Sequence, residues 1–225
     1  RLQVEHPVTE AITGVDLVEW QLRVAAGEPL PLRQDQLAIK GHAFEARLYA
    51  EDVSAGFLPA TGRLAHLAFA PDCRADTGVR AGDAISPWYD PMIAKIIVHG
   101  PTRTVALQQL SRALAETQVA GTVTNLAFLG ALARHPGFVA GDVDTGLIER
   151  DLAGLVQGEW PSPQVQAAAL LESAALTEAP LQGFTLWAPL DHGLSVELGE
   201  TVVKGRLRLT AGGPRILLDG QEIAP

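Results

Sequence analysis

Residues 41–50, GHAFEARLYA, alternate apolar and polar side chains and decide how the rest of the chain folds. Successive side chains on a β-strand point to opposite faces of the sheet. The apolar face of such a strand would carry His42, Phe44, Ala46 and Leu48. The opposite face would carry Glu45, Arg47 and Tyr49. This pattern is typical of a half-buried antiparallel strand, so we expect a strand that presents two charged groups away from the core.

The chain that follows this strand reads as further short strands. Residues 61–99 contain turn signals at Gly78 and Gly82 and end in an apolar run from Ile93 to Val98. Short apolar runs between glycine turns are typical of strands. We therefore expect this region to complete a mainly antiparallel sheet.

Three stretches with a helical period flank that sheet. Residues 15–25 form the first, and Thr13 with Asp16 resembles a capping box at its start. Thr102 is placed to cap the second and Thr124 the third. The apolar stripe of the second helix is Val105, Leu107, Leu110 and Leu114. The predicted fold class is therefore α+β, an antiparallel sheet flanked by helices.

The first ten residues, RLQVEHPVTE, alternate charged and apolar side chains up to Pro7. We read them as a strand with Arg1, Gln3 and Glu5 on one face. A guanidinium and an amide can hold a small oxyanion, while a carboxylate within reach can accept its proton. The alternative is an exposed amphipathic strand without catalytic function.

The C-terminal third has a different composition. Glycines and prolines punctuate a linker after residue 151, and a helix is expected from Gln164 to Leu176. Strands are then expected at 184–187, 200–209 and 215–218, the last followed by the hairpin pair Asp219-Gly220. This pattern indicates the beginning of a small β-barrel.

Composition excludes several classes of function. Lys and Arg number 17 against 26 Asp and Glu, a net charge of -9, and no basic run is present that could follow a nucleic acid backbone. A single cysteine, Cys73, cannot form an internal disulfide, and no Cys/His spacing suits zinc. We see neither a membrane span nor a secretory signal and expect a protein of the reducing cytoplasm.

Five motifs together resemble the biotin carboxylase family of ATP-grasp enzymes. They are RLQVEHPVTE (1–10), GHAFEARLYAED (41–52), GFLPATG (56–62), WYDPMIAKIIVHG (88–100) and VAGTVTNLAFL (119–129). The resemblance covers about residues 1–150. Among relatives, the sequences HAFEARLYAED and FLPATG are most similar to the biotin-containing subunit of acyl-CoA carboxylases, the methylcrotonoyl-CoA enzymes first and the propionyl- and acetyl-CoA enzymes next.

The resemblance implies a reaction in which ATP phosphorylates bicarbonate to carboxyphosphate, whose carbon dioxide then passes to biotin. It implies that Glu5 is the base that removes the bicarbonate proton and that Arg1 contacts bicarbonate or the transferring phosphoryl group. Gln3 and the backbone N–H of Val4 would complete the bicarbonate pocket. Either could instead be part of the sheet alone.

Three further positions receive roles from the resemblance. Arg47 would stabilise the enolate-like anion of deprotonated biotin and also contact bicarbonate, the alternative being a structural ion pair with Glu45 or Glu51. Asp90 would orient Arg47 or biotin, with a structural role equally open. Thr122 stands at a position that packs against adenine, where relatives carry Ile or Leu.

The resemblance also implies a domain organisation and a set of partners. Residues 1–14 would end an ATP-grasp domain, 15–150 would form the biotin carboxylase C-terminal domain, 151–180 a linker and helix, and 181–225 the start of a β-rich linking domain. We expect a fragment of a longer chain that is inactive alone, with the ligands of Mg²⁺ or Mn²⁺ upstream and biotin on a carrier domain elsewhere. A carboxyltransferase β subunit and a homodimer or larger hetero-oligomer are the implied assembly.

Two other readings remain open at this point. The segment could be an interaction module that supports subunit docking. It could also belong to a different ATP-grasp ligase that joins a carboxylate to an amine.

Overall fold

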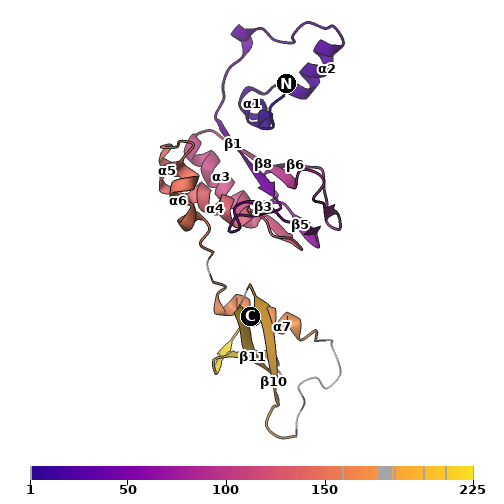
Figure 1. The fold of residues 1–225 in the computed structure, drawn as a ribbon, viewed down its shortest axis with the longest axis vertical. Helices are drawn as coiled ribbons and strands as arrows, with labels where there is room; N and C mark the ends of the chain where they lie inside the picture. Colours follow the sequence, from indigo (N-terminus) through magenta and orange to yellow (C-terminus); the bar gives the residue numbers. More distant parts are fainter. Residues whose placement is uncertain are drawn as a thin grey trace. The chain divides into compact units, whose positions relative to one another are not determined.

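The computed structural model describes residues 2–158, 160–176, 184, 186–199, 201–210 and 212–224. The chain divides into two compact units, Arg1–Gly158 and Glu159–Pro225. Figure 1 shows helices and an antiparallel sheet in the first unit, and one helix beside a sheet in the second. The predicted α+β class is confirmed.

The central sheet of the first unit has three antiparallel strands in the order β1 (His42–Tyr49), β8 (Met92–Gly100) and β6 (Arg74–Thr77). β1 and β8 run in register from the His42 and Gly100 pair to the Leu48 and Ala94 pair. A bulge then places Tyr49 opposite Met92. The strand predicted at 41–50 is confirmed.

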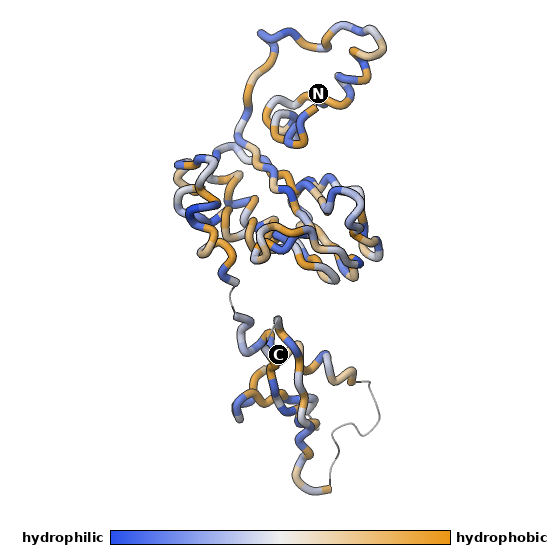
Figure 2. The backbone as a smooth tube through the Cα atoms, viewed as in Figure 1, coloured by the Kyte–Doolittle hydropathy of each residue, from blue (hydrophilic) through white to orange (hydrophobic). Residues whose placement is uncertain are grey.

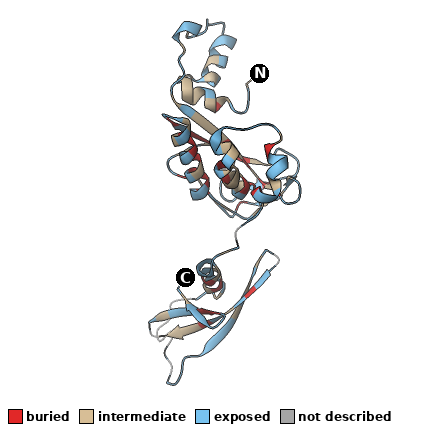
Figure 3. Cartoon of the chain, turned by 90° about the vertical axis from the view of Figure 1, so that its left-hand side faces the viewer, coloured by how far each residue is buried: buried red, intermediate tan, exposed pale blue. Residues whose placement is uncertain are grey.

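The core lies on the apolar face of this sheet, under α3 (Arg103–Glu116) and α4 (Leu126–Arg134). Leu48 and Ile96 are fully buried there against the Leu110 side of α3. Figure 3 shows the buried residues gathered between the sheet and these helices. Removing such side chains from water is the main stabilising contribution to the unit.

Shorter elements complete the first unit. Three two-stranded ladders pair β2 (Glu51–Asp52) with β3 (Leu58–Pro59), β4 (Gly62–Arg63) with β7 (Ala84–Ile85), and β5 (His66–Ala68) with β9 (Gln118–Ala120). The first unit also contains the helices α5 (Pro136–Ala140) and α6 (Leu147–Leu155) and the 3₁₀ turn Gln34–Gln36.

The strand predicted to end at Pro7 is wrong over the described residues 2–6. Residues 4 and 5 form a turn, and the helix α1 (His6–Thr13) begins directly after Glu5. Pro7 lies in the first helical turn, where its fixed φ suits the helix and its missing N–H costs nothing. The proline that we read as the end of a strand is a helix start signal.

Two helix caps lie at other residues than predicted, one and three positions further along the chain. Asp16 caps α2 (Leu17–Ala25) by accepting from the Glu19 N–H at 2.8 Å, whereas the Thr13 hydroxyl donates back to Thr9. Asn125, not Thr124, is the N-cap of α4. Helix α2 carries apolar residues (Figure 2) yet buries none of them. The cap at Thr102 is confirmed, because its side chain accepts from the Val105 N–H.

The second unit contains α7 (Pro163–Ser173), which packs against a four-stranded antiparallel sheet. Its strands are β10 (Asp191–Leu198), β11 (Thr201–Thr210), β12 (Gly213–Leu218) and β13 (Gln221–Ile223), in sequential order. The strand predicted at 184–187 is absent at residues 184, 186 and 187, and residue 185 lies outside the described residues. The hairpin turn at Asp219-Gly220 is confirmed, with φ values of 49° and 81°.

Within these ranges, no helix combines the length and the apolar composition that crossing a lipid bilayer requires.

Candidate active site

The outward face of the central sheet carries a row of charges. Arg47 on β1 is paired in register with Lys95 on β8, and Lys95 is paired with Asp76 on β6. Side chains at directly paired positions share a face of the sheet. Glu45, two residues before Arg47, adds a carboxylate to the same face. The sequence prediction that Glu45 and Arg47 share a polar face is therefore confirmed.

The turn that precedes α1 lies over this row. Arg47 Nη2 donates to Glu5 Oε2 at 2.8 Å, a contact between residues 42 positions apart in the chain. Both side chains are about half exposed, so the pair is open to solvent. Because Glu5 is the N-cap of α1 without a side-chain capping bond, its carboxylate is available to Arg47.

An open cavity of about 450 Å³ is lined by Gln3, Val4, Glu5 and Arg47. It presents a permanently charged multi-donor guanidinium, an amide and a carboxylate around one space. Such a set can hold a small planar oxyanion and place a base next to it. The structure thus brings together four of the residues singled out in the sequence.

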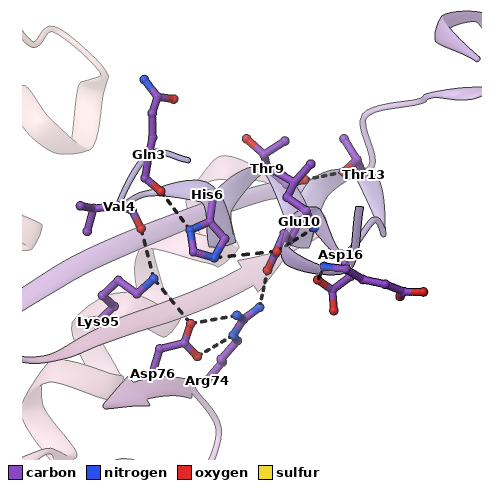
Figure 4. Close-up of polar contacts among 12 residues, drawn as sticks. Gln3, Val4, His6, Thr9, Glu10, Thr13, Asp16, Arg74, Asp76 and Lys95 are labelled. Atoms are coloured by element: carbon purple, nitrogen blue, oxygen red, sulfur yellow. Dashed lines mark hydrogen bonds and ion pairs between the residues drawn. The ribbon is translucent and has the colours of Figure 1, made fainter. Parts of the chain in front are cut away.

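Lys95 connects the turn before α1 to strand β8 of the sheet (Figure 4). Its ammonium donates to the Val4 carbonyl at 3.1 Å and lies 3.6 Å from Asp76. Arg74 holds Asp76 through two bonds of 2.8 Å and donates to Glu10 of α1 at 3.0 Å. The Arg74 guanidinium, followed by Lys95, holds the pKa of Asp76 below its usual value. This network anchors both the turn and the helix that follows it.

Glu45 differs from the other charges because its side chain is only 3% exposed. Neither of its carboxylate oxygens has a hydrogen-bond partner among the described residues. Burial raises the pKa of Glu45, and the positive charges of Lys95 and Arg47 oppose that shift.

Asp90 and Thr122 do not line the cavity. Asp90 is exposed and accepts from the Met92 N–H at 2.9 Å, which fixes the start of β8. Burial of the Tyr49 side chain raises the pKa of Tyr49, and the negative charge of Asp90 raises it further. The Thr122 hydroxyl lies 3.4 Å from the Ala60 carbonyl, to which it donates.

Asn125 joins the segment that carries Thr122 to the strand that carries Arg47. Its side chain is buried, donates to the Arg47 carbonyl at 3.1 Å and accepts from the Tyr49 N–H at 2.9 Å. Sequence reasoning missed Asn125 and Lys95. A lysine inside the apolar run of β8 and an amide directly before a helix were the available signals.

Arg1, the remaining predicted catalytic residue, lies outside the described residues. Across the described part of the chain, no group of three or more His, Cys, Asp and Glu side chains is arranged to hold a metal ion.

Comparison with protein families gives two matches. Residues 45–150 match the family model described as biotin carboxylase C-terminal domain. Residues 1–33 match the model described as carbamoyl-phosphate synthase L chain, ATP binding domain. The site residues Gln3, Val4 and Glu5 fall in the second match, and Arg47 falls in the first.

Two curated relatives and one solved structure illustrate the similarity. The mitochondrial methylcrotonoyl-CoA carboxylase subunit alpha of Arabidopsis thaliana is 50% identical over 86% of this chain and 27% of its own length. The propionyl-CoA carboxylase alpha chain of Ruegeria pomeroyi is 47% identical over 92% of this chain and 31% of its own. The chain therefore spans less than a third of these relatives' length.

The solved structure is the biotin carboxylase domain dimer of Hydrogenobacter thermophilus 2-oxoglutarate carboxylase, in complex with MgADP, ADP and bicarbonate. It superposes with a TM-score of 0.68 at 36% identity, over 71% of this chain and 36% of that one.

Proposed function

The chain belongs to the biotin carboxylase family, and from this membership we propose that its parent protein uses ATP and bicarbonate to carboxylate biotin. The observation that carries the proposal is the 2.8 Å pair between Glu5 and Arg47 at the cavity that also contains Gln3 and Val4. This arrangement combines an anion-binding cation with a base, as activation of bicarbonate requires.

Glu5 is the proposed base. Its carboxylate takes the hydroxyl proton of bicarbonate as the bicarbonate oxygen attacks the terminal phosphorus of ATP, which releases ADP and forms carboxyphosphate. Gln3 and the backbone N–H of Val4 donate to the bound anion, and Arg1 is assigned to the same anion or to the transferring phosphoryl group. The Arg47 guanidinium holds the Glu5 carboxylate at the edge of the cavity, which keeps the base aligned.

Arg47 is also the proposed electrostatic partner of biotin. When the ureido nitrogen of biotin loses its proton, negative charge develops on the ureido oxygen, and a positioned guanidinium stabilises it. One such donor is worth on the order of 3 kcal/mol. Asp90 is assigned to orienting biotin or Arg47 from the β8 end of the strand pair, and Thr122 to the adenine side of the nucleotide site.

Part of what the reaction requires, namely the metal ion and biotin, is proposed to bind outside this chain. We propose that Mg²⁺ or Mn²⁺ is held by ligands upstream of Arg1 and that biotin arrives on a carrier domain outside this chain. The proposed domain division is 1–14 for the end of the ATP-grasp domain, 15–150 for the C-terminal domain, 151–180 for a linker and helix, and 181–225 for the start of the linking domain.

For the acyl acceptor we propose methylcrotonoyl-CoA, with transfer by a separate carboxyltransferase β subunit in a dimeric or larger assembly. The Arabidopsis relative supports this choice by its name, and the Ruegeria relative makes propionyl-CoA the competing substrate. We propose a cytoplasmic location, which the single cysteine supports. Cell fractionation separates this location from the mitochondrial one of the Arabidopsis relative.

The first experiment measures acid-labile label transferred from labelled bicarbonate to free biotin by the full-length parent protein with ATP and magnesium. We expect ATP-dependent labelling that Glu5→Gln abolishes while assembly and ATP binding are retained. Glu28→Gln, an exposed carboxylate in an ion pair with Arg23, is the matched control and should label as the wild type does. A folded parent protein that binds ATP but labels no biotin would instead favour a docking module or another ATP-grasp ligase.

A further inference from the structure

The carboxylate of Glu45 is placed where a solvent-exposed group would be expected. It lies on the polar face of β1, yet its side chain is 3% exposed, and both oxygens lack a hydrogen-bond partner in the described part of the chain. A buried carboxylate without a donor is unfavourable unless nearby charges compensate it. Such a group calls for an explanation beyond packing.

Charged groups face Glu45 from each element around it. Arg47 on β1 and Lys95 on β8 attract its negative charge, His6 of α1 does so when protonated, and Glu5 repels it. The charges of β6 and the rest of α1 are engaged with one another, since Arg74 binds both Asp76 and Glu10. Glu45 is therefore a buried carboxylate that lies in the field of Arg47 and Lys95, while the carboxylates nearest to these two cations are Glu5 and Asp76.

The Arg47 guanidinium lies between two carboxylates. Its Nη2 donates to the exposed Glu5 at 2.8 Å, and its Nε lies 3.8 Å from Glu45 Oε1. The second distance exceeds a hydrogen bond by less than 1 Å. A small rotation of the Arg47 side chain would therefore exchange one carboxylate partner for the other.

We propose that Glu45 is a positioning residue that receives the Arg47 guanidinium when Glu5 takes up a proton. This inference rests on the proposed function of Glu5 as the base. The proton comes from bicarbonate and stays on Glu5, so that the Glu5 and Arg47 pair loses its attraction. Arg47 then moves its Nε onto Glu45, remains charged and ordered, and leaves the cavity side of Glu5 free.

The same exchange should affect how readily Glu5 accepts the proton of bicarbonate. With Glu45 present, the Arg47 guanidinium can be shared between two carboxylates. With Glu45 neutralised, Arg47 stays on Glu5, stabilises its ionised form and lowers its proton affinity. Losing Glu45 should therefore weaken the base without removing any group that touches bicarbonate.

The test compares Glu45→Gln with Glu51→Gln in the full-length parent protein, using ATP-dependent labelling of biotin from labelled bicarbonate. Glu51 is a partly buried carboxylate on the next strand whose pKa burial also raises, which makes it a matched control. For Glu45→Gln we expect kcat to fall about tenfold with the KM for bicarbonate nearly unchanged. The acid limb of the pH profile should move to lower pH, because Glu5 is then the weaker base.

Thermal unfolding separates positioning from a structural role. Replacing the buried carboxylate by a neutral isostere should leave the Tm at neutral pH equal or higher, so activity and stability change in opposite directions. Glu45→Asp, which keeps the charge, should restore the wild-type acid limb and is the variant to use if Glu45→Gln does not fold. Wild-type kcat and acid limb in Glu45→Gln would overturn the inference, as would a lowered Tm with an unmoved limb. Absence of biotin labelling by the wild type would instead overturn the proposed function.

Discussion

Replacing Lys95 tests how the site is held in place, because Lys95 bonds to the turn that forms the site but does not line the cavity itself. Its ammonium donates to the Val4 carbonyl at 3.1 Å, and the Lys95 side chain is 12% exposed. Lys95→Met keeps most of the side-chain volume but removes the charge and the donor. The turn that carries Gln3 and Glu5 would then lose its attachment to β8.

The magnitude follows from three contributions. Losing a charge-assisted hydrogen bond costs about 1.5–3 kcal/mol. Losing the partly exposed pair with Asp76 adds about 0–1 kcal/mol. Removing the like charge opposite Arg47 returns about 0.2–1 kcal/mol. The net destabilisation is about 2 kcal/mol, which lowers the Tm by about 4–8 °C for a unit of this size.

The functional effect should be larger than the effect on stability. Misplacement of a reacting group by about 1 Å can cost about 100-fold in rate. We expect kcat/KM for bicarbonate, measured by biotin labelling in the parent protein, to fall by about 10- to 100-fold, with the apparent affinity for ATP little changed. The control is Lys204→Met, the same substitution at an exposed position of β11 in the second unit.

Equal Tm and equal kcat/KM for bicarbonate in the Lys95→Met and Lys204→Met proteins would refute the reasoning. That result would mean that the Gln3–Glu5 turn keeps its place without the bond from β8.

Other substitutions test the fold and its response to pH. Gly121→Ala should lower the free energy of unfolding by about 2–4 kcal/mol, because its new Cβ would collide with the backbone of β4 and its φ is 106°. Gly27→Ala, with φ 88° and open space around it, should lower it by about 1 kcal/mol. Chemical denaturation measures both values. The Arg74 guanidinium lowers the pKa of Asp76, so stability present at neutral pH is lost as the pH falls below about 4; Asp76→Asn should be less stable at pH 7 and lose less on acidification. Leu48→Ala, at a fully buried position of β1, should cost about 2–5 kcal/mol and speed amide exchange across β8.

The two faces of β1 could be predicted from the sequence because each face follows from local alternation. Ala46 and Leu48 are buried, and Arg47 lies on the opposite face, as the period of two requires. The same rule failed for the first ten residues. Five alternating residues are too few to distinguish a strand from an irregular turn, and Pro7 suits the first turn of a helix as well as the end of a strand.

The supporting residues of the site depend on contacts between distant parts of the chain. The bond from Lys95 to Val4 spans 91 positions, and the bonds of Asn125 to the backbone of β1 span 76 and 78. No local pattern contains such pairings. Glu45 was considered in the sequence only as an ion-pair partner of Arg47, and its burial became visible only once α1 was found to pack against the sheet.

The pairing of β1 with β8 has a consequence for how this protein can vary. Arg47 and Leu48 are neighbours in the chain but face opposite sides of the sheet, opposite Lys95 and Ala94. Sliding β1 by one residue would send the guanidinium toward the helices and the leucine toward the cavity. A register shift of this kind would disrupt the hydrophobic core, so it could not produce a folded protein with an altered site. An insertion or deletion of one residue within the paired stretch His42–Leu48 of β1 should therefore prevent folding.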